Sequence, residues 1–94
     1  MEKQKIYLKA NPKIVCREED GDALLFNPET GLVKILNRTG YELWKLCDGT
    51  LAAEDIMAAM RKEYPDIAAL VLRDDVAKCL QVMQESELIL QTAL

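Results

Sequence analysis

The side chains that usually carry enzyme chemistry are scarce in this sequence. It contains no histidine, its only serine is Ser86, and no glycine-rich phosphate-binding loop is present. Adjacent acids occur at Glu18/Glu19 and Asp74/Asp75, where a turn and a helix start are expected. Carboxylates in such places are usually solvated or favourable to the helix dipole. The residue inventory therefore argues against catalysis and predicts a binding module without a cofactor.

The cysteines offer little more. Cys16, Cys47 and Cys79 are odd in number and widely spaced. They form no Cys-x-x-Cys pair, and without histidine the sequence lacks a convincing zinc-binding set. We predict no metal site and interpret the thiols as small buried hydrophobes in a reducing compartment.

Length and charge limit the remaining options. The 94 residues suit one domain with one core. A net charge of −4 argues against a surface that binds phosphates, which normally carries a basic excess. The first residues lead into no apolar segment typical of a secretory signal, and the longest apolar run, Ile67 to Leu72, is too short to cross a bilayer. We therefore predict a cytoplasmic protein.

The first part of the chain is expected to form a sheet. Short β-branched or aliphatic runs predict three strands, at Lys13–Glu18, Ala23–Asn27 and Leu32–Leu36. The residues between these runs include glycine and proline, which suit turns, so the strands should form an antiparallel meander. We expect residues 1–12 to be an N-terminal arm, with at most a short strand at 5–8, and residues 13–94 to be the domain.

Beyond Thr39 the apolar spacing changes to the helical period. Helices are predicted at about 39–47, at about 52–64 and from about Asp74 onward. The segment Asn37–Gly40 offers caps for the first helix, and Thr50 is a plausible cap for the second. The run Ile67–Leu72 fits either a helical turn or a packed linker, whereas Leu88–Leu90 should close on the core in extended form.

This order predicts an α+β fold that is winged-helix-like, with a three-stranded antiparallel sheet followed by three helices. The expected core residues are Leu43, Trp44, Ile56, Met60, Val76, Leu80 and Met83.

Two kinds of binding suit this architecture. A winged helix can place a helix in the DNA major groove, but acids outnumber Arg73 and Lys78 on the third helix. Alternatively, the edge strand Leu32–Leu36 can capture an extended peptide as an additional strand, with the third helix as the wall of a groove. Leu32–Leu36 also suits a plain core strand, because alternation alone buries half of it in either case.

Several short motifs resemble the PqqD family. They are Thr30-Gly31, Leu36-Asn37-x-Thr39-Gly40, Leu43-Trp44, Asp48-Gly49, Glu54-Asp55-Ile56, Asp75-Val76 and Leu88-Ile89. Together they cover about residues 13–90. Two positions depart from the family pattern, since Ala52 stands where a capping threonine is frequent and Glu87 stands where a glycine commonly precedes the final Leu-Ile pair.

The resemblance implies a non-catalytic recognition element for ribosomally made, post-translationally modified peptides (RiPPs). Family members hold the leader of a precursor peptide against the third strand and third helix. They present it to a modifying enzyme, a radical-SAM enzyme in pyrroloquinoline quinone biosynthesis. Many relatives serve other peptides, and an orphan structural role is the further alternative. An uncovered edge strand also leads us to expect a homodimer in the absence of peptide.

On this hypothesis the strand and the neighbouring helix face supply the peptide-binding residues. The expected set is Val33, Lys34, Ile35, Leu36, Asp75, Lys78, Cys79 and Val82. An apolar leader residue should lie against Ile35, Cys79 and Val82. Lys34 and Lys78 should meet acidic leader residues in exposed, weaker contacts.

Overall fold

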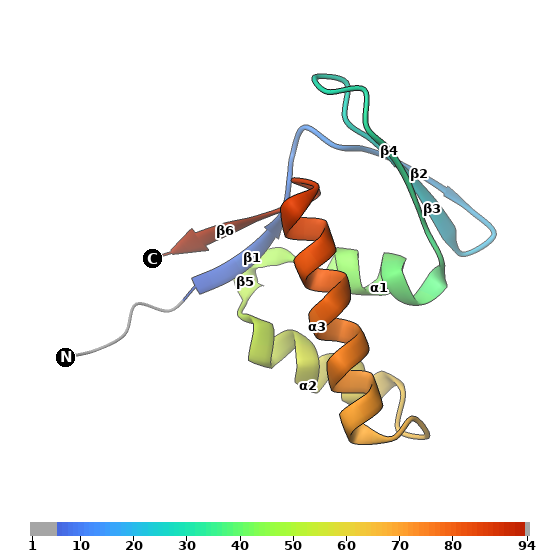
Figure 1. Ribbon diagram of the computed structural model, residues 1–94, viewed down its shortest axis with the longest axis vertical. Coiled ribbons are helices and arrows are strands. Elements are labelled where there is room, and N and C mark those ends of the chain that lie inside the picture. The colour runs from blue at the N-terminus through green and yellow to red at the C-terminus, as the bar shows by residue number, and fades with distance from the viewer. Residues whose placement is uncertain (1–5, 94) are drawn as a thin grey trace.

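The computed structural model describes residues 6–93 as an α+β fold with two small antiparallel sheets and three helices (Figure 1). This confirms the predicted class. The strands are β1 (Ile6–Ala10), β2 (Val15–Glu19), β3 (Asp22–Phe26), β4 (Val33–Leu36), β5 (Asp48–Leu51) and β6 (Ile89–Ala93). The helices are α1 (Arg38–Leu46), α2 (Ala53–Glu63) and α3 (Ala69–Glu85).

The predicted meander is the sheet β2-β3-β4. A two-residue turn joins β2 to β3, and both Asp20 (φ 53) and Gly21 (φ 90) have positive φ. This conformation is typical of a type I′ turn, whose twist matches the twist of the two strands. The register continues into β4, where Leu36 lies opposite Ala23 and Val33 lies opposite Phe26.

The second sheet has the strand order β5-β1-β6 and was not predicted. Its central strand β1 comes from the segment expected to be an arm, and Leu8 on that strand is buried. The short strand expected at 5–8 is observed at Ile6–Ala10, and Lys5 lies outside the described residues. The β6 strand confirms the extended ending predicted near Leu88–Leu90.

Helix α1 begins directly after β4 because Asn37 caps it. The Asn37 side chain accepts a hydrogen bond from the Gly40 amide at 2.9 Å, as the predicted capping segment requires. Farther along α1, Trp44 packs against the core but is only partly buried. Its indole Nε1 donates to the Leu88 carbonyl at 3.1 Å, which ties α1 to the entry of β6.

The prediction that Thr50 caps helix α2 is wrong. Thr50 lies in β5, and both its amide and its hydroxyl donate to the Asp48 carboxylate. The N-cap is Ala52, which has no polar side chain to contribute. The Asp55 carboxylate instead accepts from the Ala52 amide at 3.0 Å, so one half of a capping box is present.

Helix α3 begins at Ala69, five residues before the predicted start near Asp74. The ambiguous run Ile67–Leu72 therefore mostly belongs to the helix. At the other end, the Glu87 amide donates to Gln84 and the Leu88 amide donates to Met83, the two bonds of a Schellman motif. Glu87 has φ 59 in this motif, which gives a physical reason for the glycine common at this position.

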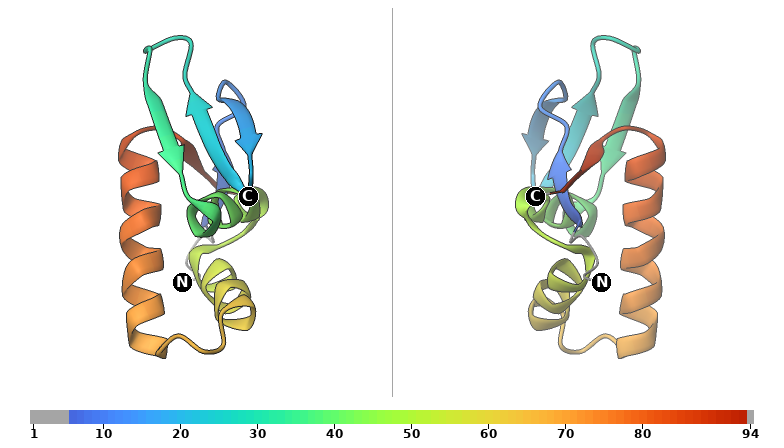
Figure 2. Two further views of the ribbon diagram at one scale, coloured as in Figure 1. Left: turned by 90° about the vertical axis from the view of Figure 1, so that its right-hand side faces the viewer. Right: turned by 90° about the vertical axis from the view of Figure 1, so that its left-hand side faces the viewer.

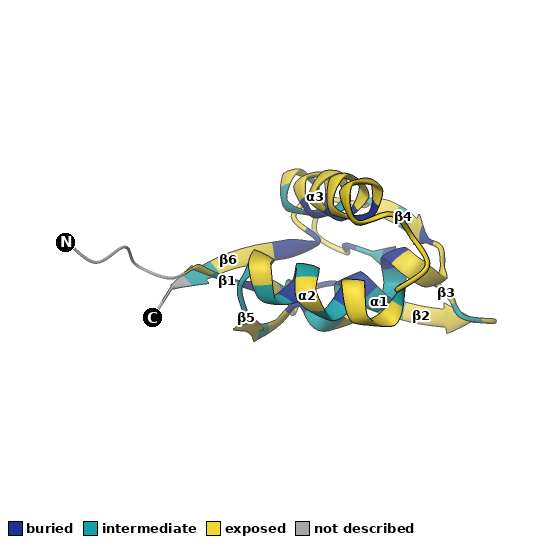
Figure 3. Ribbon diagram, turned by 90° about the horizontal axis from the view of Figure 1, so that it is seen from below, coloured by how far each residue is buried: buried dark blue, intermediate teal, exposed yellow. Residues whose placement is uncertain are grey.

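The core lies between α3, the other two helices and the inner faces of the sheets, as the buried residues in Figure 3 show. Six of the seven predicted core residues are buried, and Trp44 is the partly buried exception. The expectation for the thiols is correct only for Cys47. Cys16 and Cys79 are partly buried at the edge of the core, and all three thiols are free.

Candidate functional site

Strand β4 is an edge of its sheet, with β3 on one side and no strand of the described residues on the other. The two-residue turn makes Glu19 and Asp22 a hydrogen-bonded pair, and such pairs alternate along antiparallel strands. The same alternation directs Asn27 toward β4, where its amide donates to the Leu32 carbonyl at 2.9 Å. Extended through the register, it directs the backbone groups of Val33 and Ile35 to the free edge.

The side chains of β4 alternate between the two faces of the sheet. Leu36 is buried and Lys34 is partly buried on the inner face, which they share with the fully buried Leu25 of β3. Val33 and Ile35 lie on the outer face and are 53% and 71% exposed. An extended peptide at this edge would place alternate side chains on the same two faces.

Helix α3 runs beside β4, as both views in Figure 2 show. One exposed flank of the helix carries Val71, Asp75, Lys78 and Val82, spaced i, i+4, i+7 and i+11. Three of these residues were predicted, whereas Val71 was missed because its segment was not assigned to a helix. Its signal in the sequence is the same spacing continued one turn toward the start of α3.

Two hollows mark the ends of the space between β4 and α3. One, of about 320 Å³, lies at the junction of β4 and α1, where Asn37 and Gly40 face Asp75 and Cys79. Its floor includes Leu43, Met60 and Val76 from the core. The other, of about 430 Å³, lies between the β3–β4 loop and the end of α3. The name β4–α3 groove is used for these two hollows together with the facing surfaces of β4 and α3 between them.

The charges on the α3 side of the groove are solvent-exposed and mixed in sign, whereas Lys34 on β4 is partly buried. Lys78 forms an ion pair with Asp74 at 2.9 Å, and this hydrogen-bonded carboxylate raises the pKa of Lys78. Burial raises the pKa of the Cys79 thiol, and the nearby ammonium of Lys34 partly offsets that effect. This electrostatic effect of Lys34 on Cys79 indicates that the inward side chain of β4 lies on the side of the sheet nearest the middle of α3.

The structure separates two groups of predicted site residues. Lys34, Cys79 and Asp75 lie at the groove, and Val82 lies on the same flank of α3. Val33 and Ile35 contribute backbone groups to the edge, but their side chains are on the outer face. One apolar leader side chain therefore cannot contact Ile35 together with Cys79 and Val82, and that part of the expected pocket is wrong.

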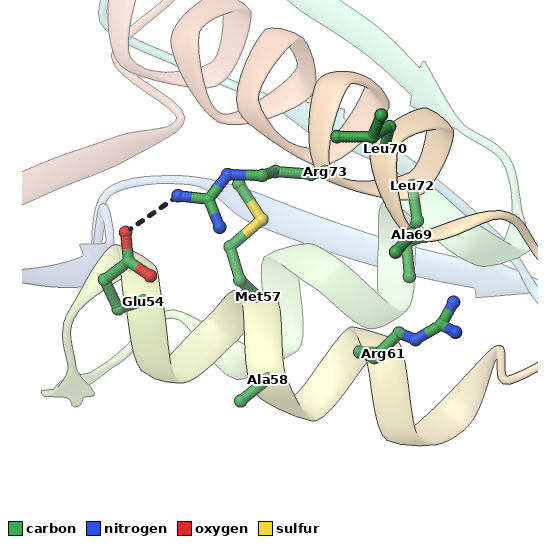
Figure 4. Close-up of a pocket in the computed structure, with 8 residues that line it drawn as sticks. All are labelled: Glu54, Met57, Ala58, Arg61, Ala69, Leu70, Leu72 and Arg73. Atoms are coloured by element: carbon green, nitrogen blue, oxygen red, sulfur yellow. Dashed lines mark hydrogen bonds and ion pairs between the residues drawn. The ribbon is translucent and has the colours of Figure 1, made fainter.

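A further hollow, of about 420 Å³, lies between α2 and α3 (Figure 4). It is lined mainly by apolar side chains, and an ion pair of 3.3 Å between Arg73 and Glu54 spans it. Its α3 residues include none of the predicted site residues. Among residues 6–93 no cluster of histidine, cysteine and acidic side chains could hold a metal, and each helix is too short or too polar to span a bilayer.

Comparisons with known proteins agree with this geometry. The family model for PqqD, described as coenzyme PQQ synthesis protein D, matches residues 22–89. No curated protein matches the sequence.

Two solved structures share the fold. One is described as TbiB1 in complex with the TbiA(beta) leader peptide, with a TM-score of 0.74 and 23% identity over 86% of this chain and 93% of that one. The other is a lasso peptide synthetase B1 complexed with the leader peptide, with a TM-score of 0.73 and 18% identity over 88% of this chain and 96% of that one. Because the family model covers well over half of the sequence, this chain belongs to the PqqD family.

Proposed function

We propose that this chain binds the leader of a ribosomal precursor peptide by strand addition at β4 and presents it to a modifying enzyme. The observation that best supports this proposal is the free edge of β4, which lies beside an exposed flank of α3. Backbone groups at such an edge supply hydrogen bonds to any extended peptide, and the neighbouring helix supplies selectivity. The two leader-peptide complexes that share the fold support the same assignment.

The edge of β4 and the flank of α3 make different kinds of contact with the leader. Val33 and Ile35 offer the backbone edge, whereas Lys34, Asp75, Lys78, Cys79 and Val82 contact side chains that point inward. Leu36 is buried and holds the end of β4 in the core. Its role is to position the strand, since its side chain is inaccessible to a peptide.

The protein acts as a carrier without a catalytic role, and the partner enzyme performs the modification. We place a radical-SAM enzyme in that position, in pyrroloquinoline quinone or related RiPP biosynthesis. Three free cysteines fit the reducing cytoplasm. Without peptide, the exposed edges of two copies pair into a homodimer, because an edge with only Lys34 as a charge is weakly protected.

A DNA-binding role is not favoured. Asp74, Asp75 and Glu85 on α3 would repel phosphates, and the two solved complexes that share the fold hold leader peptides.

An amide chemical-shift titration tests the proposal. The ¹⁵N-labelled chain is titrated with a synthetic leader of the precursor encoded beside it. We expect the largest shifts at Val33, Ile35 and the flank of α3 from Val71 to Val82. Shifts confined to α2, or no shifts, would refute leader binding at β4.

A further inference from the structure

The outer face of the β2-β3-β4 sheet carries several large apolar side chains although it is uncovered, with the charged pair Arg17 and Glu19 at its β2 edge. A sheet with one face in solvent normally carries polar side chains on that face. Here Val15, Leu24, Val33 and Ile35 are all exposed. The register places Val15, Phe26 and Val33 in one cross-strand row, and Leu24 between Arg17 and Ile35 in the next. No helix or strand of the described residues covers this face, which the left view of Figure 2 presents to the reader.

On this face, the apolar side chains of the two edge strands, β2 and β4, are more exposed than those of the central strand. Ile35 is 71% exposed, whereas its partner Leu24 on the central strand is 39% exposed. A side chain on an edge strand has a neighbour on one side only, so a further strand would cover its free side. Side chains that an added peptide strand places on the outer face would thus lie directly beside Val33 and Ile35.

Geometry then fixes where the side chains of that peptide point. Val33 and Ile35 direct their backbone groups to the free edge, so a peptide strand pairs with them there. Residues directly opposite each other share one face of a sheet, so the peptide residues opposite Val33 and Ile35 place their side chains on the outer face. The peptide residue between them points inward, toward Lys34 and α3. A leader with apolar residues only on its inward side would leave Val33 and Ile35 exposed.

Resting on the proposed function, we infer that the bound leader segment carries large apolar side chains at the two alternate positions that face away from α3, where Val33 and Ile35 select them. The outer face therefore contributes to leader specificity together with the groove. The side chain of the residue between these two positions contacts Lys34 and α3 instead. The recognised ligand is therefore an extended segment of three residues. Its first and third residues are apolar and lie on the outer face, and its second residue points toward α3.

Threonine substitutions at β4 test this inference. Val33→Thr and Ile35→Thr keep β-branching, and therefore strand propensity, while adding a hydroxyl to the outer face. The matched control is Val15→Thr, because Val15 is 56% exposed on the same face but on β2, the strand farthest from β4 in the sheet. Affinity for the same synthetic leader is measured by calorimetry, and thermal unfolding of each variant is recorded.

We expect each β4 variant to weaken binding about threefold and the double variant about tenfold, with less than about twofold change for the control. If the double variant binds leader with unchanged affinity and still shows the β4 amide shifts, the inference is overturned. The proposed leader binding at β4 would stand in that case. An equal loss in the Val15→Thr control would also overturn it. If the wild-type chain shows no β4 shifts, the proposed function itself fails.

The peptide side gives a second measurement that does not depend on folding of a variant. Leaders are synthesised with serine at both outward positions or at the single inward position, the positions being located by contacts to β4 amides. The outward pair should lose about tenfold in affinity for the wild-type chain and little for the double variant. The same loss with both proteins would contradict direct contact with Val33 and Ile35.

Discussion

Val82 on α3 provides the sharpest test of the groove. Its side chain lies one helical turn from Lys78 on the exposed flank and leaves 43% of the residue accessible. A bound leader would cover that remainder, on the order of 60 Å², which is worth about 1.5 kcal/mol at about 25 cal/mol per Å². Val82→Asp removes this gain and also brings a carboxylate toward the peptide, so leader affinity should fall at least about tenfold.

The matched control is Gln81→Asp in the same turn of the helix. Gln81 is exposed on a different side of α3, where its amide donates to Glu85 at 3.0 Å. Both variants place the same charge in the last turns of α3, one residue apart, so their effects on the helix dipole are similar. Calorimetry should therefore separate the two, while urea unfolding should show similar, small losses of stability. Equal affinities of Val82→Asp and wild type would refute the groove on this flank.

Four further outcomes are expected. Trp44→Ala should lower the free energy of unfolding by about 3 kcal/mol, because it removes core contacts and the hydrogen bond to Leu88. Urea titration measures this loss, and a much smaller value would contradict the packing of Trp44 against the core. Glu87→Gly should raise that free energy by about 1 kcal/mol, since glycine adopts φ 59 without strain. Iodoacetamide at pH 8 should leave Cys47 of the native protein unmodified, because burial raises the pKa of that thiol to about 12. Rapid alkylation of Cys47 would contradict its burial. Bound leader should slow the alkylation of Cys79, which lies at the groove. Sedimentation should detect a dimer that dissociates when leader is added, and a strict monomer at high concentration would contradict pairing through β4.

Local sequence signals predicted the meander and the three helices because short-range chemistry decides them. Asp20-Gly21 sets the first hairpin, and Asn37 caps α1. The second sheet depends on pairing across about forty residues between β1 and β5 and about eighty between β1 and β6. The Asp48-Gly49 pair in β5 is locally indistinguishable from a simple helix stop. Nothing in a local window shows that Leu8 will lie opposite Leu51.

The candidate site was predicted in part for the same reason. The helix spacing identified Asp75, Lys78 and Val82, and the position of α3 beside β4 followed the family resemblance. The faces of β4 could not be assigned from Leu32–Leu36, because a nearly continuous apolar run lacks the alternation that distinguishes inside from outside. The exposure of Ile35 is therefore information that only the folded sheet provides.

The shortness of β4 has a consequence for how long a peptide stays bound. Only Val33 and Ile35 direct an amide and a carbonyl to the free edge. A few such bonds contribute about 0.5–1.5 kcal/mol each, and ordering each peptide residue costs about 1–2 kcal/mol. The backbone contacts therefore set the register but add little net affinity, and the residence time depends on a small number of side chains. On the proposed function, weak backbone contacts of this kind would allow a modified peptide to leave quickly and the next one to bind, which a longer edge strand would hinder.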